Sequence, residues 1–445
     1  MLNYIWLGLI LAAVLIGGAT GRMAEVTTGA FDAARMSVMN IALPLVGVMA
    51  LWLGIMRLAE KSGVIYIIAS GIRPVMRFLF PEVPPNHPAN GAMLMNIAAN
   101  MLGLGNAATP LGIKAMRHLE QLNPRPGTAT NAMCTFLAIN TSSVQLVSAT
   151  TVGILAAAGS VMPTAIIGTA LVATMCSTMV ALIAVKTLEK LPLFQLPPAD
   201  PGDLAARSEE DRETEEEEIL LEPPAPLTPG KKAVLLLFCA AFVFFFAAQL
   251  NPGLAFWLEA PEEAADGLFV RVMGALAVLA IPFAVAFFPL YAALNKVKVY
   301  EEFVEGAKEG FNIALRIIPY LVAIFVAIGM FRGADGIALL AWILGPILEF
   351  LRFPVDLLPL AFMRPLSGSG SQALLAELAA THGPDSFLAR AGATLAGSTE
   401  TTFYVLAVYF GAVGIRRTRH AVPAGLLADV TGIIVAVTVA TIVFG

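Results

Sequence analysis

Residues 397–402 read Gly-Ser-Thr-Glu-Thr-Thr and stand between two apolar runs, residues 387–396 and 403–413. Because roughly 20 apolar residues cross a membrane as a helix, the two runs together are long enough to span a bilayer. A carboxylate in the middle of such a span costs about 2.5–3.5 kcal/mol or more, so it normally faces the protein interior or a water-filled cavity and marks a functional site. We therefore predict an interrupted transmembrane helix that lines a solute site around Glu400. The alternative is a continuous helix whose hydroxyl groups bond to their own backbone carbonyls.

The composition indicates a polytopic membrane protein. Of the 445 residues, 58% are hydrophobic and 13% are charged, and the mean hydropathy is +0.79. The three cysteines lie far apart without a CxxC pair, and none of the four histidines has a second ligand at metal spacing. We therefore predict no disulfide, no metal site and no cofactor.

Other apolar runs predict further helices. No basic segment precedes residues 2–19, so we predict a retained transmembrane helix there and not a signal peptide. Residues 62–80 are amphipathic and carry Arg73 and Arg77 on one face, which favours a helix at the membrane interface or packed within the protein. The remaining predicted spans are residues 36–58, 161–185, 233–250 and 268–294.

Two more apolar regions are broken by polar residues, glycine or proline. Within residues 88–116, the stretch from Gly103 to Pro110 holds two glycines, an asparagine and a proline, which is enough to break a helix. Broken backbone at membrane depth is tolerated only where it is buried in protein or lines a cavity. We predict a re-entrant hairpin, with a loop at the membrane surface as the alternative. Residues 130–158 have a polar centre at residues 140–145 and form a second interrupted segment.

Residues 197–229 differ from the rest of the chain. They are rich in proline and include an acidic run at residues 209–218. Like charges with few apolar residues cannot offset the entropy of ordering, so we predict a solvated, disordered linker. The run lacks the ligand spacing of an EF-hand calcium site.

The part of the chain after the linker repeats the part before it. Residues 312–315 read Asn-Ile-Ala-Leu, as do residues 40–43, and Pro346 matches Pro74 at the same offset of 272 residues. The glycine pair at residues 368 and 370 matches that at residues 103 and 105, and Thr399 matches Thr141. The fold class predicted is an all-α polytopic membrane protein, a tandem repeat with re-entrant hairpins and interrupted transmembrane helices. The domains predicted are a first repeat (1–190), an acidic linker (191–230), an extra span with its loop (231–267) and a second repeat (268–445).

Lysine and arginine suggest an orientation. Placing Arg22, residues 186–190, residues 231–232 and residues 296–298 in the cytoplasm makes the two repeats parallel. The basic cluster at residues 416–420 then falls on the outer side, which argues against that scheme. We expect parallel repeats, with inverted repeats as the alternative.

The broken segments resemble a known family. Residues 84–88 (PPNHP) and 100–116 (NMLGLGNAATPLGIKAM) resemble spore maturation protein A. Segments of the second repeat resemble spore maturation protein B, namely 364–370 (RPLSGSG), 383–387 (GPDSF), 397–402 (GSTETT) and 409–411 (YFG). The likeness covers nearly the whole chain except the linker and the extra span. It implies a fused protein with two nucleoside recognition, or Gate, domains.

The resemblance implies membrane transport without naming a solute. Gate domains also occur in concentrative nucleoside carriers and ferrous-iron permeases. The family often has aspartate where this chain has Glu400, so the acidic group is kept.

Candidate site residues can be given roles. Glu400 is the candidate coupling group, because burial favours the neutral acid while a nearby cation restores its charge. Arg364 either pairs with Glu400 or binds an anionic group of a substrate. The other candidate substrate-binding residues are break glycines and neutral donors or acceptors: Asn100, Gly103, Gly105, Asn106, Thr109, Asn140, Thr141, Ser142, Ser367, Gly368, Ser369, Gly370, Ser398, Thr399 and Thr401.

These observations predict a transporter-like protein of the inner (cytoplasmic) membrane that moves a small polar solute through a site between the repeats. The expected partners are membrane lipid, the solute, and H⁺ or Na⁺ as a coupling ion; a homo-oligomer is left open, and no nucleic acid is expected. A non-transporting role in envelope or spore maturation is the alternative. An enzyme is not expected, because Ser367 or Ser398 would need an adjacent base and His382 lies in a loop some way off in sequence.

Overall fold

The structure is a computed structural model that describes residues 2–85, 87–103, 105–195, 227–251, 268–336, 338–339 and 353–445. The prediction for the acidic linker and the match at Pro346 lie outside these residues. Every regular element in the described residues is helical, and five helical segments are long and apolar enough to cross a membrane. The chain is therefore an all-α polytopic membrane protein, as its composition predicts.

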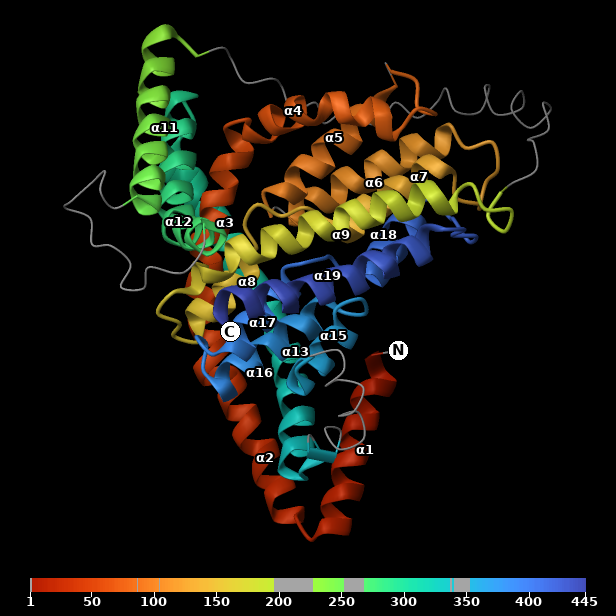
Figure 1. Cartoon of the computed structure of the whole chain (residues 1–445), viewed down its shortest axis with the longest axis vertical. Helices are drawn as coiled ribbons and strands as arrows, with labels where there is room; N and C mark the ends of the chain where they lie inside the picture. The colour runs from red at the N-terminus through yellow and green to blue at the C-terminus, as the bar shows by residue number, and fades with distance from the viewer. Residues whose placement is uncertain are drawn as a thin grey trace.

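The first half begins with two helical arms. Helix α1 (Leu2–Thr20) is followed by α2 (Met23–Met36), which continues through a π-helical turn (Ser37–Ala42) into α3 (Leu43–Lys61). The π turn ends two residues before Pro44, which has no N–H to continue the regular hydrogen-bond ladder. Figure 1 shows α13 between the arms α1 and α2, and α13 packs against both.

A helical hairpin follows the predicted amphipathic helix. Helix α4 (Val64–Leu79) exposes Arg73 and Arg77. Helices α5 (Pro88–Met101) and α6 (Gly105–Gln121) pack against each other as a hairpin. They have 14 and 17 residues, fewer than the roughly 20 that a full crossing needs. The hairpin predicted at residues 88–116 is therefore confirmed.

The first half ends with an interrupted helix and a long one. Helix α7 (Asn131–Ser142) and helix α8 (Ala149–Ala157) are separated by residues 143–148, which we call the first break. A 3-10 turn (Pro163–Ala165) leads into α9 (Ile166–Leu188).

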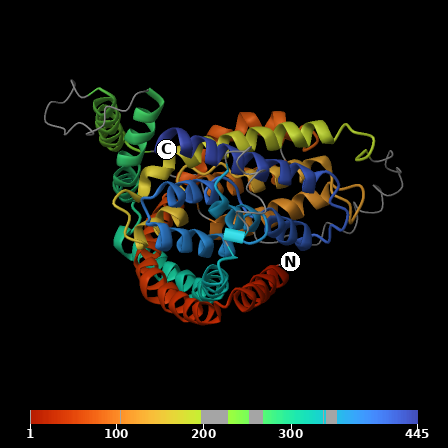
Figure 2. The ribbon, with the colours of Figure 1, turned by 60° about the horizontal axis from the view of Figure 1, so that its bottom comes forward.

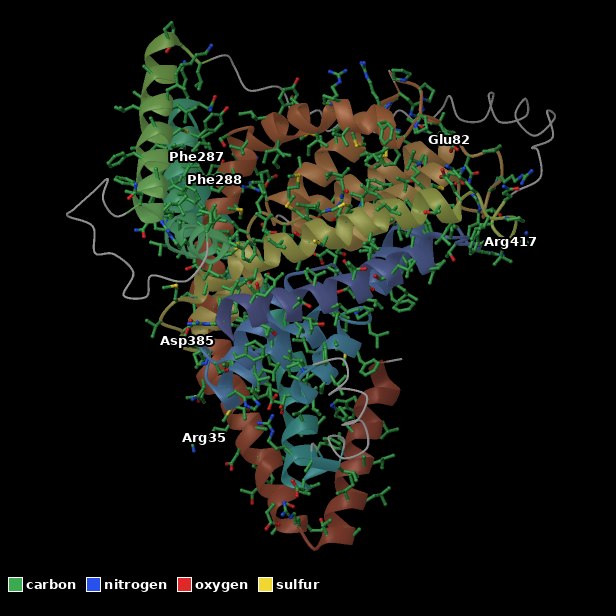
Figure 3. The ribbon with its side chains drawn as sticks, viewed as in Figure 1. Arg35, Glu82, Phe287, Phe288, Asp385 and Arg417 are labelled. Atoms are coloured by element: carbon green, nitrogen blue, oxygen red, sulfur yellow. The ribbon has the colours of Figure 1, made fainter. Side chains whose placement is uncertain are left out.

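Two apolar helices stand at one edge of the protein. Helices α11 (Pro229–Leu250) and α12 (Leu268–Leu294) pack together through phenylalanine rings, including Phe238, Phe242 and Phe283. Figure 3 labels Phe287 and Phe288 on α12 beside α11. Figure 1 shows this pair apart from the hairpins.

The second half has the same order of elements as the first. Its long helix α13 is followed by a short helix, a hairpin partner, an interrupted helix and a final long helix. The bounds are α13 (Val299–Gly333), a 3-10 turn (Val355–Leu357), α15 (Leu358–Met363), α16 (Gly368–His382), α17 (Phe387–Ala396), α18 (Thr402–Ala412) and α19 (Ala421–Phe444). Residues 397–401, between α17 and α18, are the second break. The interrupted helix predicted around Glu400 is confirmed.

The two halves are inverted, and the expected parallel arrangement is wrong. A Cβ atom added to Gly29 of α2 would lie 2.5 Å from the carbonyl oxygen of Gly329, and one added to Gly310 would lie 2.5 Å from that of Met49 in α3. The partner number in α13 falls as the number in α2–α3 rises, so these helices run antiparallel and touch. Because α13 is the repeat of α2–α3, equivalent helices point in opposite directions. In Figure 2 the red and teal helices lie together on one side of the blue ones.

The basic cluster near the C-terminus agrees with inversion. The guanidinium of Arg419 donates to the carbonyl oxygen of Phe194 at 2.6 and 3.0 Å, so the cluster lies beside the segment that follows α9 and Lys190. The parallel scheme placed these two basic regions on opposite sides. It failed because it fitted the directions of the helices to the positions of basic residues, whereas the packing of α13 against α2–α3 fixes them directly.

Candidate functional site

The two breaks lie against each other. The backbone N–H of Glu400 donates to the carbonyl oxygen of Thr141 at 2.7 Å, and the side-chain amide of Gln145 donates to the Glu400 carboxylate. The hydroxyl of Ser148 lies 3.4 Å from the carbonyl oxygen of Gly397. Residues predicted in separate halves are thus neighbours in one place.

The first break and the start of α18 each bond to the hairpin of their own half. The N–H of Leu146 donates to the carbonyl oxygen of Met101 at 2.9 Å, and the N–H of Phe403 donates to that of Pro365 at 3.1 Å. A helix break inside a membrane protein leaves backbone groups that need partners. The hairpins supply them at corresponding positions in the two repeats.

The two halves are also joined at the ends of the interrupted helices that lie away from the breaks. At one end, the N–H groups of Arg416 and Arg417 donate to the carbonyl oxygen of Gly127, both at 2.9 Å. At the other end, the Ser160 hydroxyl and the Val161 N–H donate to the Asp385 carboxylate at 2.7 and 2.8 Å. Figure 3 shows Asp385 and Arg417 far apart, one at each end. The two breaks therefore lie between two regions in which the halves are hydrogen-bonded to each other.

Charged side chains gather around the second break. A guanidinium nitrogen of Arg364, which is 7% exposed, lies 4.0 Å from the carboxylate of Glu400, which is 36% exposed. Asp429 of α19 is 1% exposed and accepts a hydrogen bond from the Thr402 hydroxyl at 2.6 Å. The charge of Arg364 acts on Asp429 as well as on Glu400. One guanidinium thus serves two carboxylates.

Neutral side chains occupy the corresponding place near the first break. The Asn100 amide donates to the Asn140 side-chain oxygen at 2.8 Å, and the Tyr409 hydroxyl donates to the same oxygen at 3.3 Å. The Asn96 amide donates to the Tyr409 oxygen at 3.1 Å. Tyr409 belongs to α18, so the second half completes the polar cluster of the first.

The site predicted from sequence lacked Gln145 and Thr402, which lie within or beside the predicted polar stretches, and also Asp429, Asn96 and Tyr409. Asp429 is a carboxylate within the apolar span of α19, so the rule that singled out Glu400 applies to it equally. Asn96 and Tyr409 gave no such signal, because a single amide or phenol within an apolar helix is common.

The tip of the second hairpin lies beside the second break. Ser367 caps α16 by accepting a hydrogen bond from the N–H of Gly370 at 3.0 Å, and its hydroxyl lies 3.4 Å from that of Ser369. A Cβ atom added to Gly368 would lie 3.1 Å from the Thr401 hydroxyl oxygen. These four predicted hairpin residues therefore lie next to the break that holds Glu400.

The tip of the first hairpin lies beside the first break in the same way. Gly103 has a φ of 74°, which glycine adopts without strain, and a Cβ atom there would lie 3.1 Å from the carbonyl oxygen of Val147. Gly105 begins α6 and Thr109 lies within it, partly buried. The side chain predicted for Asn106 lies outside the described part of the structure.

Some of the predicted hydroxyl groups bond to their own helix. Ser142 donates to the carbonyl oxygen of Ala138 at 3.0 Å, and Ser398 donates to that of Leu395 at 2.7 Å. Bonding of a hydroxyl group to the backbone of its own helix, which was the alternative for residues 397–402, therefore occurs at Ser398, and Ser142 of the first half does the same. Thr141 and Thr399 differ, because their hydroxyl oxygens are buried without a hydrogen-bond partner among the described residues.

The described residues offer little for other chemistry. They contain no group of three histidine, cysteine, aspartate or glutamate side chains that could hold a metal ion. A cavity of about 480 Å³ is lined by residues such as Glu82, Asn131 and Arg419 and by none of the predicted site residues. Because Arg364, Glu400 and Asp429 gather at the breaks and do not line this cavity, we place the candidate site at the breaks.

Comparison with known proteins points to one family. The family described as Gate, nucleoside recognition, matches residues 42–189 and 314–416, together more than half of the chain. Both matched segments contain a break.

Two curated relatives each match nearly their whole length. Spore maturation protein B of Bacillus subtilis is 42% identical over 176 residues, which is 40% of this chain and 99% of the relative. Spore maturation protein A of the same organism is 40% identical over 183 residues, which is 41% of this chain and 93% of the relative. The chain is thus similar to two separate proteins joined into one.

One solved structure is also similar. MtrF of Neisseria gonorrhoeae, described as illuminating a class of antimetabolite efflux pumps, matches with a TM-score of 0.44 and 16% identity. The match covers 93% of this chain and 84% of MtrF.

Proposed function

The chain belongs to the Gate, or nucleoside recognition, family, and from that premise we propose that it carries a small polar solute across the inner membrane of the cell. The solute site lies between the two breaks, and the protein is a carrier and not an enzyme.

One observation supports this proposal most. Glu400 is partly exposed, yet it stands at a break in an apolar helix and bonds to Thr141 and Gln145 of the other half. In transporters built from inverted repeats, solute sites form where discontinuous helices of the two halves meet. An exposed carboxylate at such a junction is a suitable group for a solute or an ion to reach.

The surrounding chemistry suits a small polar solute. The hairpin hydroxyls Ser367 and Ser369, the side-chain amide of Gln145 and the hydroxyl of Thr401 provide donors and acceptors close to Glu400. Arg364 provides a buried positive charge beside them. A solute with hydroxyl or amide groups would find partners here, and H⁺ or Na⁺ would couple its movement.

The test begins with the purified protein. Nucleosides, amino acids and polyols are screened by the melting temperature of the protein in detergent, and compounds that raise it are tested for uptake into proteoliposomes under H⁺ or Na⁺ gradients. We expect at least one compound to be taken up, with a loss of about tenfold or more in Ser369→Leu. Glu400→Gln should fold but lose the dependence on the gradient.

A matched control is Glu305→Gln, which removes an exposed glutamate that pairs with Lys308 on α13. It should leave uptake unchanged. Uptake by Glu400→Gln that is still fully driven by the gradient would exclude the coupling role of Glu400. A protein that binds and moves none of the compounds would favour the second candidate below.

The names of the two relatives support a second candidate, a structural or regulatory role in spore or envelope maturation without transport. A spore-forming strain that lacks both relatives separates the two functions. Restoration by the unaltered chain but not by Glu400→Gln favours transport. Equal restoration by both favours the structural role.

A further inference from the structure

One face of α19 lies against the second break and against Thr141 near the end of α7. Gly425, Asp429 and Gly432 are spaced at i, i+4 and i+7 and therefore share a helix face. A Cβ atom added to Gly425 would lie 2.9 Å from a carbon of Thr402, and one added to Gly432 would lie 2.7 Å from a carbon of Thr399. With glycine on either side, Asp429 lies close to the threonines at the second break, and its carboxyl group accepts a hydrogen bond from the Thr402 hydroxyl.

Several polar atoms on this face have no hydrogen-bond partner among the described residues. They are Oδ1 of Asp429 and the hydroxyl oxygens of Thr399 and Thr141, all buried. The other oxygen of Asp429 accepts a hydrogen bond from Thr402, and the side chain of Thr399 faces the carboxyl group. A buried oxygen without a partner is costly, so a ligand or a proton is expected at Oδ1.

The local charges do not balance if both carboxyl groups are ionised. Arg364 carries one positive charge, whereas Glu400 and Asp429 would carry two negative ones. The helices that pack on α19 bring few other charges, and these lie away from Asp429: Lys186 acts on His420 at the start of α19, and Arg390 lies over Phe444 at its end. The remaining titratable groups on these helices are Cys134, Cys176, Arg271, Tyr291, Tyr404 and Tyr409.

Burial decides which carboxyl group is neutral. Glu400 is 36% exposed and can stay ionised beside Arg364. Asp429 is 1% exposed, and a buried carboxylate without its own cation normally takes up a proton. A proton on Oδ1 would donate to the Thr399 hydroxyl and give both unpartnered atoms a partner.

We propose that Asp429 is a proton-binding site that exchanges its proton with Glu400 as Arg364 moves from one carboxylate to the other. In the arrangement described, Arg364 lies beside ionised Glu400, and Asp429 carries the proton. In the second arrangement the O–H bond of Asp429 is broken, one forms at Glu400, and Arg364 pairs with the Asp429 carboxylate. The net charge of the three groups is zero in both. Glu400, which is partly exposed, then releases the proton to water, and the net charge of −1 that remains is brought back to zero when Asp429 takes up the next proton.

A proton fits this place better than a metal cation. The glycine face of α19 is in close contact with the threonines of the breaks, as the short Cβ distances show. A sodium ion would need room and a shell of oxygen ligands, whereas a proton needs only the hydrogen bond from Asp429 to Thr399. This inference extends the proposed function and rests on it for its role in coupling.

Infrared spectroscopy of the purified protein in nanodiscs tests the proton directly. At neutral pH we expect the C=O band of a protonated carboxylic acid, and we expect Asp429→Asn to lose it. The control Asp335→Asn removes a 54% exposed aspartate whose φ of 67° asparagine tolerates, and it should keep the band. An unaltered protein without the band at neutral pH, or a band that persists in Asp429→Asn, would overturn the proposal.

A second variant covers the case in which Asp429→Asn does not fold. Thr402→Val removes the hydroxyl that donates to Asp429, so the acid band should shift to higher frequency. An unchanged band would overturn the assignment. Sodium is tested by melting temperature in sodium chloride and choline chloride: sodium-specific stabilisation together with an absent acid band would show a sodium site and overturn the proton site.

The outcomes separate this inference from the proposed function. An acid band that depends on Asp429 in a protein that moves no solute would leave the proton site standing and remove the transport role. Solute uptake by a protein without that band would remove the proton site alone.

Discussion

The two breaks have similar backbones and different side chains. Near the first break, the amides of Asn100 and Asn140 meet the hydroxyl of Tyr409. Near the second break, Arg364 lies 4.0 Å from the Glu400 carboxylate, and its charge also acts on Asp429. In both halves a backbone N–H in the break or in the first turn of the helix after it bonds to the hairpin of that half. Duplication therefore preserved the scaffold, and charge divided the roles: the neutral half is suited to holding a solute and the charged half to responding to an ion.

Removing the cation of the charged half should have the largest effect. Arg364→Gln leaves Glu400 and the buried Asp429 without a positive charge, and we expect a loss of about 3–5 kcal/mol in the free energy of unfolding. The double change Arg364→Gln with Glu400→Gln should recover much of that loss, because Glu400 is the ionised partner of Arg364 and Asp429 is neutral in the arrangement proposed above. Thermal denaturation in detergent measures both.

The control for this comparison is Arg57→Gln. Arg57 is 31% exposed and bonds to Glu302 at 3.1 Å, so its loss should cost less than about 1 kcal/mol. Equal melting temperatures for Arg364→Gln and Arg57→Gln would mean that the charged half does not depend on its arginine.

Removing a hydroxyl group from the neutral cluster near the first break should lower stability by a smaller amount and leave ion coupling unchanged. Tyr409→Phe removes the hydroxyl that joins Asn96 to Asn140, and it should cost about 1–3 kcal/mol because buried amide groups lose a partner. We expect uptake to keep its dependence on the ion gradient. Loss of that dependence would show that the two halves share the coupling role and would contradict the division of roles between them.

The stability provided by the hydrogen bonds from Ser160 and Val161 to Asp385 should depend on pH. Asp385 lies in the loop between α16 and α17; burial opposes its charge, but hydrogen bonds from Ser160, Val161 and Arg390 hold its pKa below the ordinary value. Its carboxylate therefore stabilises the fold above the ordinary pKa of about 3.9, and this stability is lost as pH falls through the lower folded value.

Asp385→Asn should accordingly cost about 1 kcal/mol at neutral pH. The melting temperatures of the two proteins should converge under acid conditions. A difference that stays constant with pH would show that the shape of the side chain matters and its charge does not.

The linker between the halves should matter least. Deleting residues 200–222, or replacing them by glycine and serine, should change the free energy of unfolding by less than about 0.5 kcal/mol, because a solvated acidic run stabilises no contact. Uptake should also be unchanged. Loss of folding on deletion would mean that the acidic run packs against one of the halves.

Much of this architecture could be predicted from local features of the sequence. Glycine, proline and polar residues in apolar runs located the hairpin at residues 88–116 and the break at Glu400. The matching Asn-Ile-Ala-Leu stretches identified the duplication. The rule for intramembrane acids found Glu400 but was not applied to Asp429, although both stand in apolar spans. The orientation was wrong because the positions of basic residues do not by themselves fix how many times the chain crosses the membrane.

The sequence by itself determined the class of protein, the breaks, the repeat and most of the spans, although the span of α19 was not predicted, because hydropathy and helix-breaking residues act over a few neighbouring positions. Only the tertiary structure decided that α13 runs antiparallel to α2–α3, that Tyr409 completes the neutral cluster, and that Asp429 shares Arg364 with Glu400. Membrane helices are apolar on every face, so no hydrophobic stripe indicates which face packs against which neighbour. Contacts between distant residues then follow from close packing of small residues, which becomes visible only when the helices are assembled.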